Sequence, residues 1–224
     1  MSIKLFRRLS ALSGSIGVIL LGISFTINPG PPANATAAQL MAFADQNFTS
    51  ILWGAWLQAV GPLLIVLFAF ALVSLAGATT RLAGWMTMFG GTILMTVSLV
   101  EITFYMGTLY APTTKFVSFD LIHAVQHLYF IVAAPSLFLP LGTVLLGSAV
   151  LPRVFGYLAL ALGAAFAILG VVFLSSLTLP AAVQDSGGIQ AFWWLAAAIT
   201  LIIRPAKTSD MASMKGQESV GSAW

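Results

Sequence analysis

The sequence has no cysteine and very little charge. Without cysteine, the chain can form no disulfide, no thiolate nucleophile, no iron–sulfur cluster and no Cys-ligated zinc site. Only 7% of its 224 residues are charged and 59% are hydrophobic, whereas soluble domains have about 25% charged residues. So few charges cannot cover a water-soluble surface. We therefore expect lipid to solvate most of the chain.

The sequence also lacks the patterns of several common function classes. Its net formal charge is +3, but lysine and arginine stand singly or in pairs beside apolar runs and form no basic patch. We therefore expect no nucleic-acid partner. P-loop, Rossmann and GxSxG patterns are absent as well, so nothing supports nucleotide-driven transport or serine hydrolysis by that motif.

What the sequence does contain is long apolar runs. A membrane-spanning helix needs about 20 apolar residues, and six stretches reach or approach that length. We predict an all-α fold, a polytopic bundle of six transmembrane helices in a single domain over residues 1–204. Residues 205–224 are predicted to be a flexible, polar cytoplasmic tail. The predicted spans are residues 9–28, 49–77, 84–108, 118–149, 154–176 and 189–203.

The charges predict the orientation of these spans. Six crossings place eight of the nine lysines and arginines on one side, and Lys115 on the other side together with Asp45, Asp120 and Asp185. Cytoplasmic loops carry an excess of lysine and arginine. We therefore predict a multi-pass protein of the inner cell membrane with both termini in the cytoplasm. The eight cations are Lys4, Arg7, Arg8, Arg81, Arg153, Arg204, Lys207 and Lys215.

Aromatic residues fall near the predicted ends of the spans, as expected of side chains that prefer the membrane–water interface. Trp85 lies near the predicted inner interface. Those near the predicted outer interface are Trp53, Trp56, Tyr105, Tyr110, Trp193 and Trp194.

The first span has an alternative interpretation. Basic residues, an apolar run and the small-residue sequence Ala33-Asn34-Ala35 together resemble a cleavable signal peptide. The apolar run is too long for a typical signal peptide, and three prolines intervene before the cleavage site. We favour a retained helix, and cleavage would leave five spans in the same orientation.

The longest outer loop, residues 29–48, contains a predicted short helix over 36–46 with Thr36 as its N-cap. We favour an interfacial helix that lies on the bilayer. The alternative is a lid over an outward-facing pocket.

The fourth stretch contains Pro135 and Pro140. Each proline removes a backbone donor and crowds the preceding turn, so we expect this helix to bend or break within the membrane. One interpretation is a kink that improves packing. The functional alternative is a discontinuous helix whose freed carbonyls line a binding cavity, as in many transporters.

Small residues recur at helical spacing in several spans. Gly84, Gly91 and Ser98 follow a seven-residue step, as do Gly156, Gly163 and Gly170. Such stripes let helix backbones approach closely, so we interpret them as packing positions.

Glu101, His123 and His127 are the ionisable residues predicted well inside a span. Measured from the outer ends of their helices, Glu101 lies about 10 Å deep, between His123 at about 8 Å and His127 at about 13 Å. The third and fourth spans are joined by a short loop and should be neighbours. A buried carboxylate should face the bundle interior and have a partner, or be neutral. Three further residues reach the same level: Tyr105, Gln126 and Gln58.

Three interpretations of this cluster remain open. It can be a structural network that fixes helix contacts. It can be a metal site for zinc or another divalent cation, because two histidines four residues apart plus a carboxylate, here Glu101, His123 and His127, form a known ligand set. It can also be a protonatable site that binds a cation or a polar ligand, with Tyr105, Gln126 and Gln58 in support.

The layout of basic N-terminus, first span, outer loop with a short helix and five further spans resembles bacterial six-helix membrane proteins of unknown function. The segment from His123 to His127 is also similar to the HxxxH of membrane ceramidase-type zinc hydrolases, although their third histidine and seventh helix are missing.

We expect an integral membrane protein that binds a small ligand or cation in an outward-facing intramembrane pocket, and whether binding is coupled to protons is left open. The alternatives are a non-catalytic accessory or assembly subunit of a larger membrane complex, and a zinc-dependent membrane hydrolase. Partners beyond the lipid bilayer would be membrane proteins or further copies of the chain, and no catalytic residue is assigned.

Overall fold

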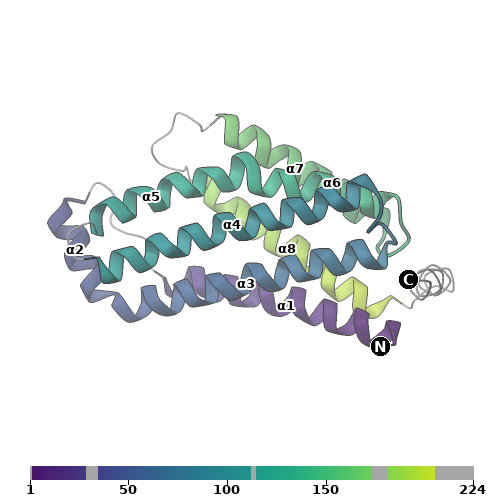
Figure 1. Ribbon diagram of the computed structural model, residues 1–224, viewed down its shortest axis with the longest axis horizontal. Coiled ribbons are helices and arrows are strands. Elements are labelled where there is room, and N and C mark those ends of the chain that lie inside the picture. The colour runs from purple at the N-terminus through teal and green to yellow at the C-terminus, as the bar shows by residue number, and fades with distance from the viewer. Residues whose placement is uncertain (1, 29–34, 112–114, 173–180, 205–224) are drawn as a thin grey trace, which may run out of the picture.

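The computed structural model describes residues 2–28, 35–111, 115–172 and 181–204, and for 115–116 and 181–187 it describes the backbone alone. Every regular element within these ranges is a helix, which confirms the predicted all-α fold class (Figure 1). The elements are α1 (Ile3–Ile27), α2 (Ala37–Gln46), α3 (Phe48–Leu75), α4 (Leu82–Tyr110), α5 (Lys115–Leu128), the π-helical turn η1 (Tyr129–Ala133), α6 (Ala134–Leu146), α7 (Arg153–Val172) and α8 (Ala181–Ile203).

A helix lies at each of the six predicted spans. Five helices in the described ranges are long and apolar enough to cross a membrane: α1, α3, α4, the continuous helix Val117–Leu146 and α7. The sixth predicted span lies in α8, where the apolar part, Gly188–Ile203, is shorter. The predicted end of the fifth span, residues 173–176, and the predicted tail, 205–224, lie outside the described residues.

The long helices form one bundle whose loops gather at two ends (Figure 1). The start of α1, the α3–α4 turn, the α6–α7 turn and the end of α8 lie at one end, and α2 lies across the other. The first of these is called the basic end here, because it carries Lys4, Arg7, Arg8, Arg81, Arg153 and Arg204. The opposite one is the α2 end.

The buried side chain of Arg7 ties the first helix to the last at the basic end. Its guanidinium donates to the backbone carbonyls of Leu201 at 3.2 Å and Arg204 at 2.9 Å. Leu201 lies in the last turn of α8 and Arg204 directly follows that helix, where backbone carbonyls lack N–H partners within the helix. The contact therefore closes the bundle by joining the two helices that are farthest apart in sequence.

Glycines set the closest helix contacts, as the spacing of small residues predicts. A Cβ on Gly17 of α1 would lie 2.7 Å from the carbonyl oxygen of Gly61 in α3, and a Cβ on Gly142 of α6 would lie 2.9 Å from that of Gly156 in α7. Both distances are below van der Waals contact, so any larger residue would force the helices apart. The predicted packing positions Gly91, Gly163 and Gly170 likewise face neighbouring helices.

The helix that carries both prolines does not break. It runs continuously over Val117–Leu146, and the wide turn η1 precedes Pro135. In η1 the Ala134 N–H donates to the carbonyl of Tyr129, five residues back. The extra residue in that turn relieves the crowding that a proline ring causes, because it shifts the carbonyls that the ring would meet. The alternative of a discontinuous helix is therefore wrong for these residues.

The short helix α2 begins where the sequence predicts. The Thr36 side chain accepts from the Gln39 backbone N–H, while the Gln39 side chain accepts from the Thr36 N–H, which completes a capping box. One face of α2 packs on the bundle, where the buried Ala44 and the neighbouring Phe43 meet Phe119 of α5. The helix thus covers the ends of α4 and α5 in addition to lying across the bundle end.

Two of the predicted interfacial tryptophans are core residues. Trp193 and Trp194 are only 3% and 1% exposed and pack against Phe138. The prediction failed because α8 starts at Ala181, eight residues before the predicted span. Trp193 therefore lies about 18 Å along the helix. By contrast, the exposed aromatic residues near helix ends include Trp53, Trp56, Trp85 and Tyr110.

Candidate functional site

The contact between α3 and α4 positions the only glutamate in the described helices. The Ser98 hydroxyl, one turn before Glu101, donates to the backbone carbonyl of Gln58 at 3.2 Å. Both Ser98 and Gln58 are buried. This bond fixes the two helices at one level, so that the Gln58 side chain faces Glu101.

Two amides from different helices hold the Glu101 carboxylate. The Gln58 Nε2 of α3 donates to Oε2 at 2.7 Å, and the Gln126 Nε2 of α5 donates to Oε1 at 3.1 Å. Each carboxylate oxygen therefore receives one donor, and hydrogen bonds to an ionised group are stronger than bonds between neutral groups. Both amides are neutral, so they orient the carboxylate without cancelling its negative charge.

Two more polar side chains extend the cluster toward the α2 end. The Tyr105 hydroxyl, one turn beyond Glu101, is hydrogen-bonded to the Asn28 side chain and lies within electrostatic range of the carboxylate. Asn28 caps the end of α1 and packs on Gly54, where an added Cβ would stand 2.6 Å from the Asn28 Cβ. The Asn28 Oδ1 is buried and, within the described part of the chain, has no hydrogen-bond partner. Such an atom usually finds a donor, a water or an ion.

The hydrogen bonds that hold the Glu101 carboxylate come from Gln58 and Gln126 and not from His123 or His127. The His127 Nδ1 lies 2.8 Å from the backbone carbonyl of His123, one turn back on the same helix. Among the described residues, no three His, Cys, Asp or Glu side chains lie close enough together to hold a metal ion. The geometry therefore gives no support to a metal site made of Glu101, His123 and His127.

The reason is the rotation of α5 about its axis. Its buried positions Phe119 and Ile122 set the face that packs on α4 and α2. With the buried Ser118 and Val125, these positions centre on the direction of Ile122. Gln126 lies about 40° from that direction, whereas His123 and His127 lie about 100° and about 140° from it. Residue depth, which the sequence does give, fixes the level of a side chain along a helix but not this rotation.

Sequence reasoning missed Asn28, and it missed a second polar pair deeper in the bundle. The Tyr129 hydroxyl in η1 donates to the Oε1 of the buried Gln190 in α8. A lone amide at the end of the first apolar run was a usable signal for Asn28. No pattern could have paired Tyr129 with Gln190, because the partners are 61 residues apart in sequence.

The arrangement is suited to binding. When it is ionised, Glu101 supplies a negative charge, while Asn28 and Tyr105 supply oxygens that can coordinate a cation or accept a hydrogen bond from a ligand. No protein-family model, curated protein or solved structure matches the chain. What the site can do therefore follows from its own geometry.

Proposed function

We propose that this is a six-span inner-membrane protein, with both termini in the cytoplasm, that binds a small cation in an outward-facing intramembrane site. The observation that carries the proposal is the Glu101 carboxylate, held between two neutral amides inside an apolar helix bundle. An ionised side chain within a membrane segment is costly, and such residues often mark ion or substrate sites.

The lengths of the helices support six crossings. The apolar part of α8, Gly188–Ile203, rises about 24 Å and the whole helix, Ala181–Ile203, about 34 Å. The helix therefore reaches across the roughly 30 Å of a bilayer's hydrocarbon core when its first turns are included. With α8 crossing, the bundle has an even number of passes, and the start of α1 and the end of α8 both lie at the basic end (Figure 1).

The charge distribution supports the orientation. The basic end carries six of the described lysines and arginines, while Asp45 and Asp120 lie toward the α2 end. Because positive charge favours the cytoplasmic side, the α2 end, and with it the Glu101 site, faces outward.

The contacts of α1 favour a retained helix over a cleaved signal peptide. Ser13 and Ser24 donate to backbone carbonyls of α3, each at 2.8 Å. Arg7 holds the end of α8, and Asn28 belongs to the polar cluster. Removal of α1 would leave these partners exposed and would open one wall of the site.

A bound cation would balance the negative charge of the Glu101 carboxylate, which an anion or a neutral solute would not do. The hydrogen-bond partners of the carboxylate among the described residues are neutral, so a bound cation would compensate its charge. The buried Asn28 Oδ1 offers a second oxygen, on a side chain that is hydrogen-bonded to Tyr105. Oxygen donors of this kind suit hard cations.

The test compares Glu101→Gln with Asp120→Asn, an exposed acid on α5 that serves as the matched control. Thermal unfolding of the purified protein is measured in NaCl, KCl and choline chloride at constant ionic strength. We expect at least one of these cations to stabilise the wild type and Asp120→Asn, by about 2.7 kcal/mol at 100 times its dissociation constant. Glu101→Gln should lose that stabilisation. If wild type and Glu101→Gln respond alike to all three salts, Glu101 is a structural residue and the proposal fails.

A further inference from the structure

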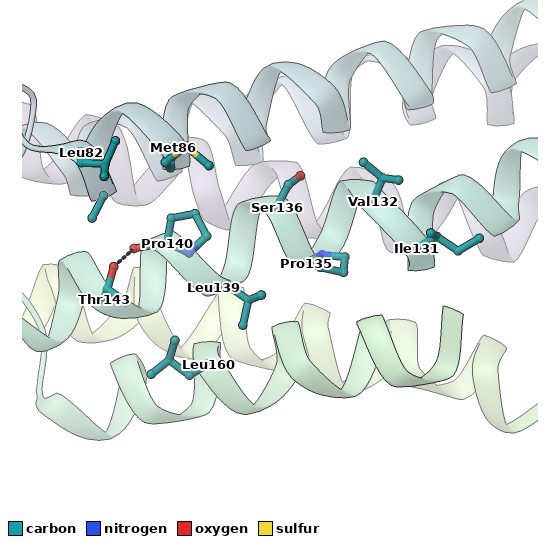
Figure 2. A pocket seen from close by; sticks show the side chains of 11 residues that line it. Leu82, Met86, Ile131, Val132, Pro135, Ser136, Leu139, Pro140, Thr143 and Leu160 are labelled. Atoms are coloured by element: carbon teal, nitrogen blue, oxygen red, sulfur yellow. Dashed lines mark hydrogen bonds between the residues drawn. The ribbon is translucent and has the colours of Figure 1, made fainter. Parts of the chain in front are cut away.

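An apolar groove runs along α4 and α6 from the basic end toward the middle of the bundle (Figure 2). Its volume is about 590 Å³, within the range of about 300–1,000 Å³ that small-molecule pockets occupy. The residues that shape it include Leu82 and Met86 of α4, Val132 of η1, Leu139 and Pro140 of α6, and Leu160 of α7.

The groove offers hydrocarbon contacts and almost no hydrogen bonds. Its two hydroxyl groups are turned back onto their own helix: Ser136 Oγ donates to the carbonyl of Ala133 at 3.0 Å, and Thr143 Oγ1 to that of Pro140 at 2.7 Å. Figure 2 shows the Thr143 bond within the groove wall. A polar ligand would lose hydrogen bonds to water here without replacement, so the groove suits an alkyl chain.

The length and position of the groove match one leaflet of a membrane. From Thr143 to Ile131, the wall spans twelve residues of helix, or about 18 Å. Half of a hydrocarbon core is about 15 Å thick. A lipid acyl chain that enters at the basic end would therefore lie along the groove over its whole depth.

The basic end of the bundle, where the groove begins, carries exposed cations. Arg81 is exposed and directly precedes Leu82, the first residue of α4 and part of the groove wall. Other exposed cations, Lys4, Arg8 and Arg153, lie at the same end. The acids with described side chains, Asp45, Glu101 and Asp120, lie in the other half of the bundle.

We propose that this groove is a binding site for an anionic phospholipid. One acyl chain lies between α4 and α6, and the phosphate of the headgroup lies beside the Arg81 guanidinium. The site is separate from the Glu101 cluster, and either can exist without the other.

The first test measures lipid binding to the purified full-length protein by native mass spectrometry, with phosphatidylglycerol and phosphatidylcholine as the two probes. We expect the wild type to prefer phosphatidylglycerol. Arg81→Gln should weaken phosphatidylglycerol binding about fivefold, the effect of one cation near an anionic lipid. Arg8→Gln, which removes an exposed cation of the same end on α1, should change it less than twofold. Equal losses in the two variants would mean a diffuse basic surface and would overturn the site.

The second test fills the groove. Met86 is half exposed and lines it, whereas Phe89 is exposed on the same helix and does not line it. We expect Met86→Trp to weaken the binding of both lipids and Phe89→Trp to leave it unchanged. Unchanged phosphatidylglycerol binding in Met86→Trp would overturn the proposal. So would displacement of the lipid by inorganic phosphate, since that would show a site for the phosphate alone.

Discussion

At the scale of the residue, Gln58 positions Glu101 through both its side chain and its backbone. Its buried amide donates to Oε2, and its backbone carbonyl accepts from Ser98. We predict that Gln58→Met, which keeps the side-chain length but removes the donor, destabilises the protein by about 1–3 kcal/mol, because a buried charged acceptor loses its partner. Thermal unfolding in detergent measures the change.

The control for this prediction is Gln46→Met, because Gln46 ends α2 with an exposed side chain. It should change stability by less than about 0.5 kcal/mol. If Gln58→Met unfolds at the same temperature as wild type, the bond to Glu101 contributes nothing to the folded state.

That Glu101 faces protein was foreseeable, but its partners were not. A lone acid in an apolar run must face protein, and counting residues along the helices correctly brought Gln58 and Gln126 to its level. The same counting brought the histidines there. Only the packing of Phe119 and Ile122 decides which side of α5 meets α4, and that is a tertiary property.

At the scale of the element, the contact between α4 and α6 depends on one glycine. Pro140 provides no N–H for the carbonyl of Ser136 four residues earlier, and that carbonyl lies directly against Gly90 of α4. A Cα–H donor at this close approach partly replaces the missing N–H. The proline and the glycine therefore act together across two helices.

We predict that Gly90→Ala destabilises the protein by about 1–3 kcal/mol, because the new methyl group overlaps the Ser136 backbone. The matched control is Gly22→Ala in α1, where an added Cβ would meet nothing within 4 Å. That variant should be neutral or more stable by up to about 1 kcal/mol, since alanine favours a helix over glycine. Thermal unfolding of both variants in the same detergent checks the pair, and equal stability of the two would contradict the packing described here.

The sequence showed where prolines leave the α5–α6 helix without backbone N–H donors. It did not show how the fold would compensate for the missing hydrogen bonds. Proline position is a local property, and it correctly marked the region of irregularity. The compensation comes from the wide turn η1 before Pro135 and from the close approach of Gly90 on α4 to the Ser136 carbonyl. The positions of the prolines in the sequence indicate neither of these features. The expectation of a bend or a break therefore did not include the continuous helix with one wide turn that the structure has.

At the scale of the whole molecule, charge and polarity separate along the bundle axis. The basic end carries Arg81 and Arg153, and the Glu101 cluster lies toward the α2 end (Figure 1). The all-helical class and the positions of the long helices followed from composition and apolar run length alone. Which helices touch did not, and the junction of α1 with α8 through Arg7 rests on contacts 194 and 197 residues apart.

The most direct test of the account is which end of the bundle faces outward. Because the chain has no cysteine, a single introduced cysteine can be labelled without background. The measurement is labelling of Asp45→Cys and Arg153→Cys in intact cells with a membrane-impermeant maleimide, and again after the cells are opened. We predict that Asp45→Cys reacts in intact cells and Arg153→Cys only in opened cells. Labelling of Arg153→Cys but not Asp45→Cys in intact cells would place the Glu101 site on the cytoplasmic side and contradict the account.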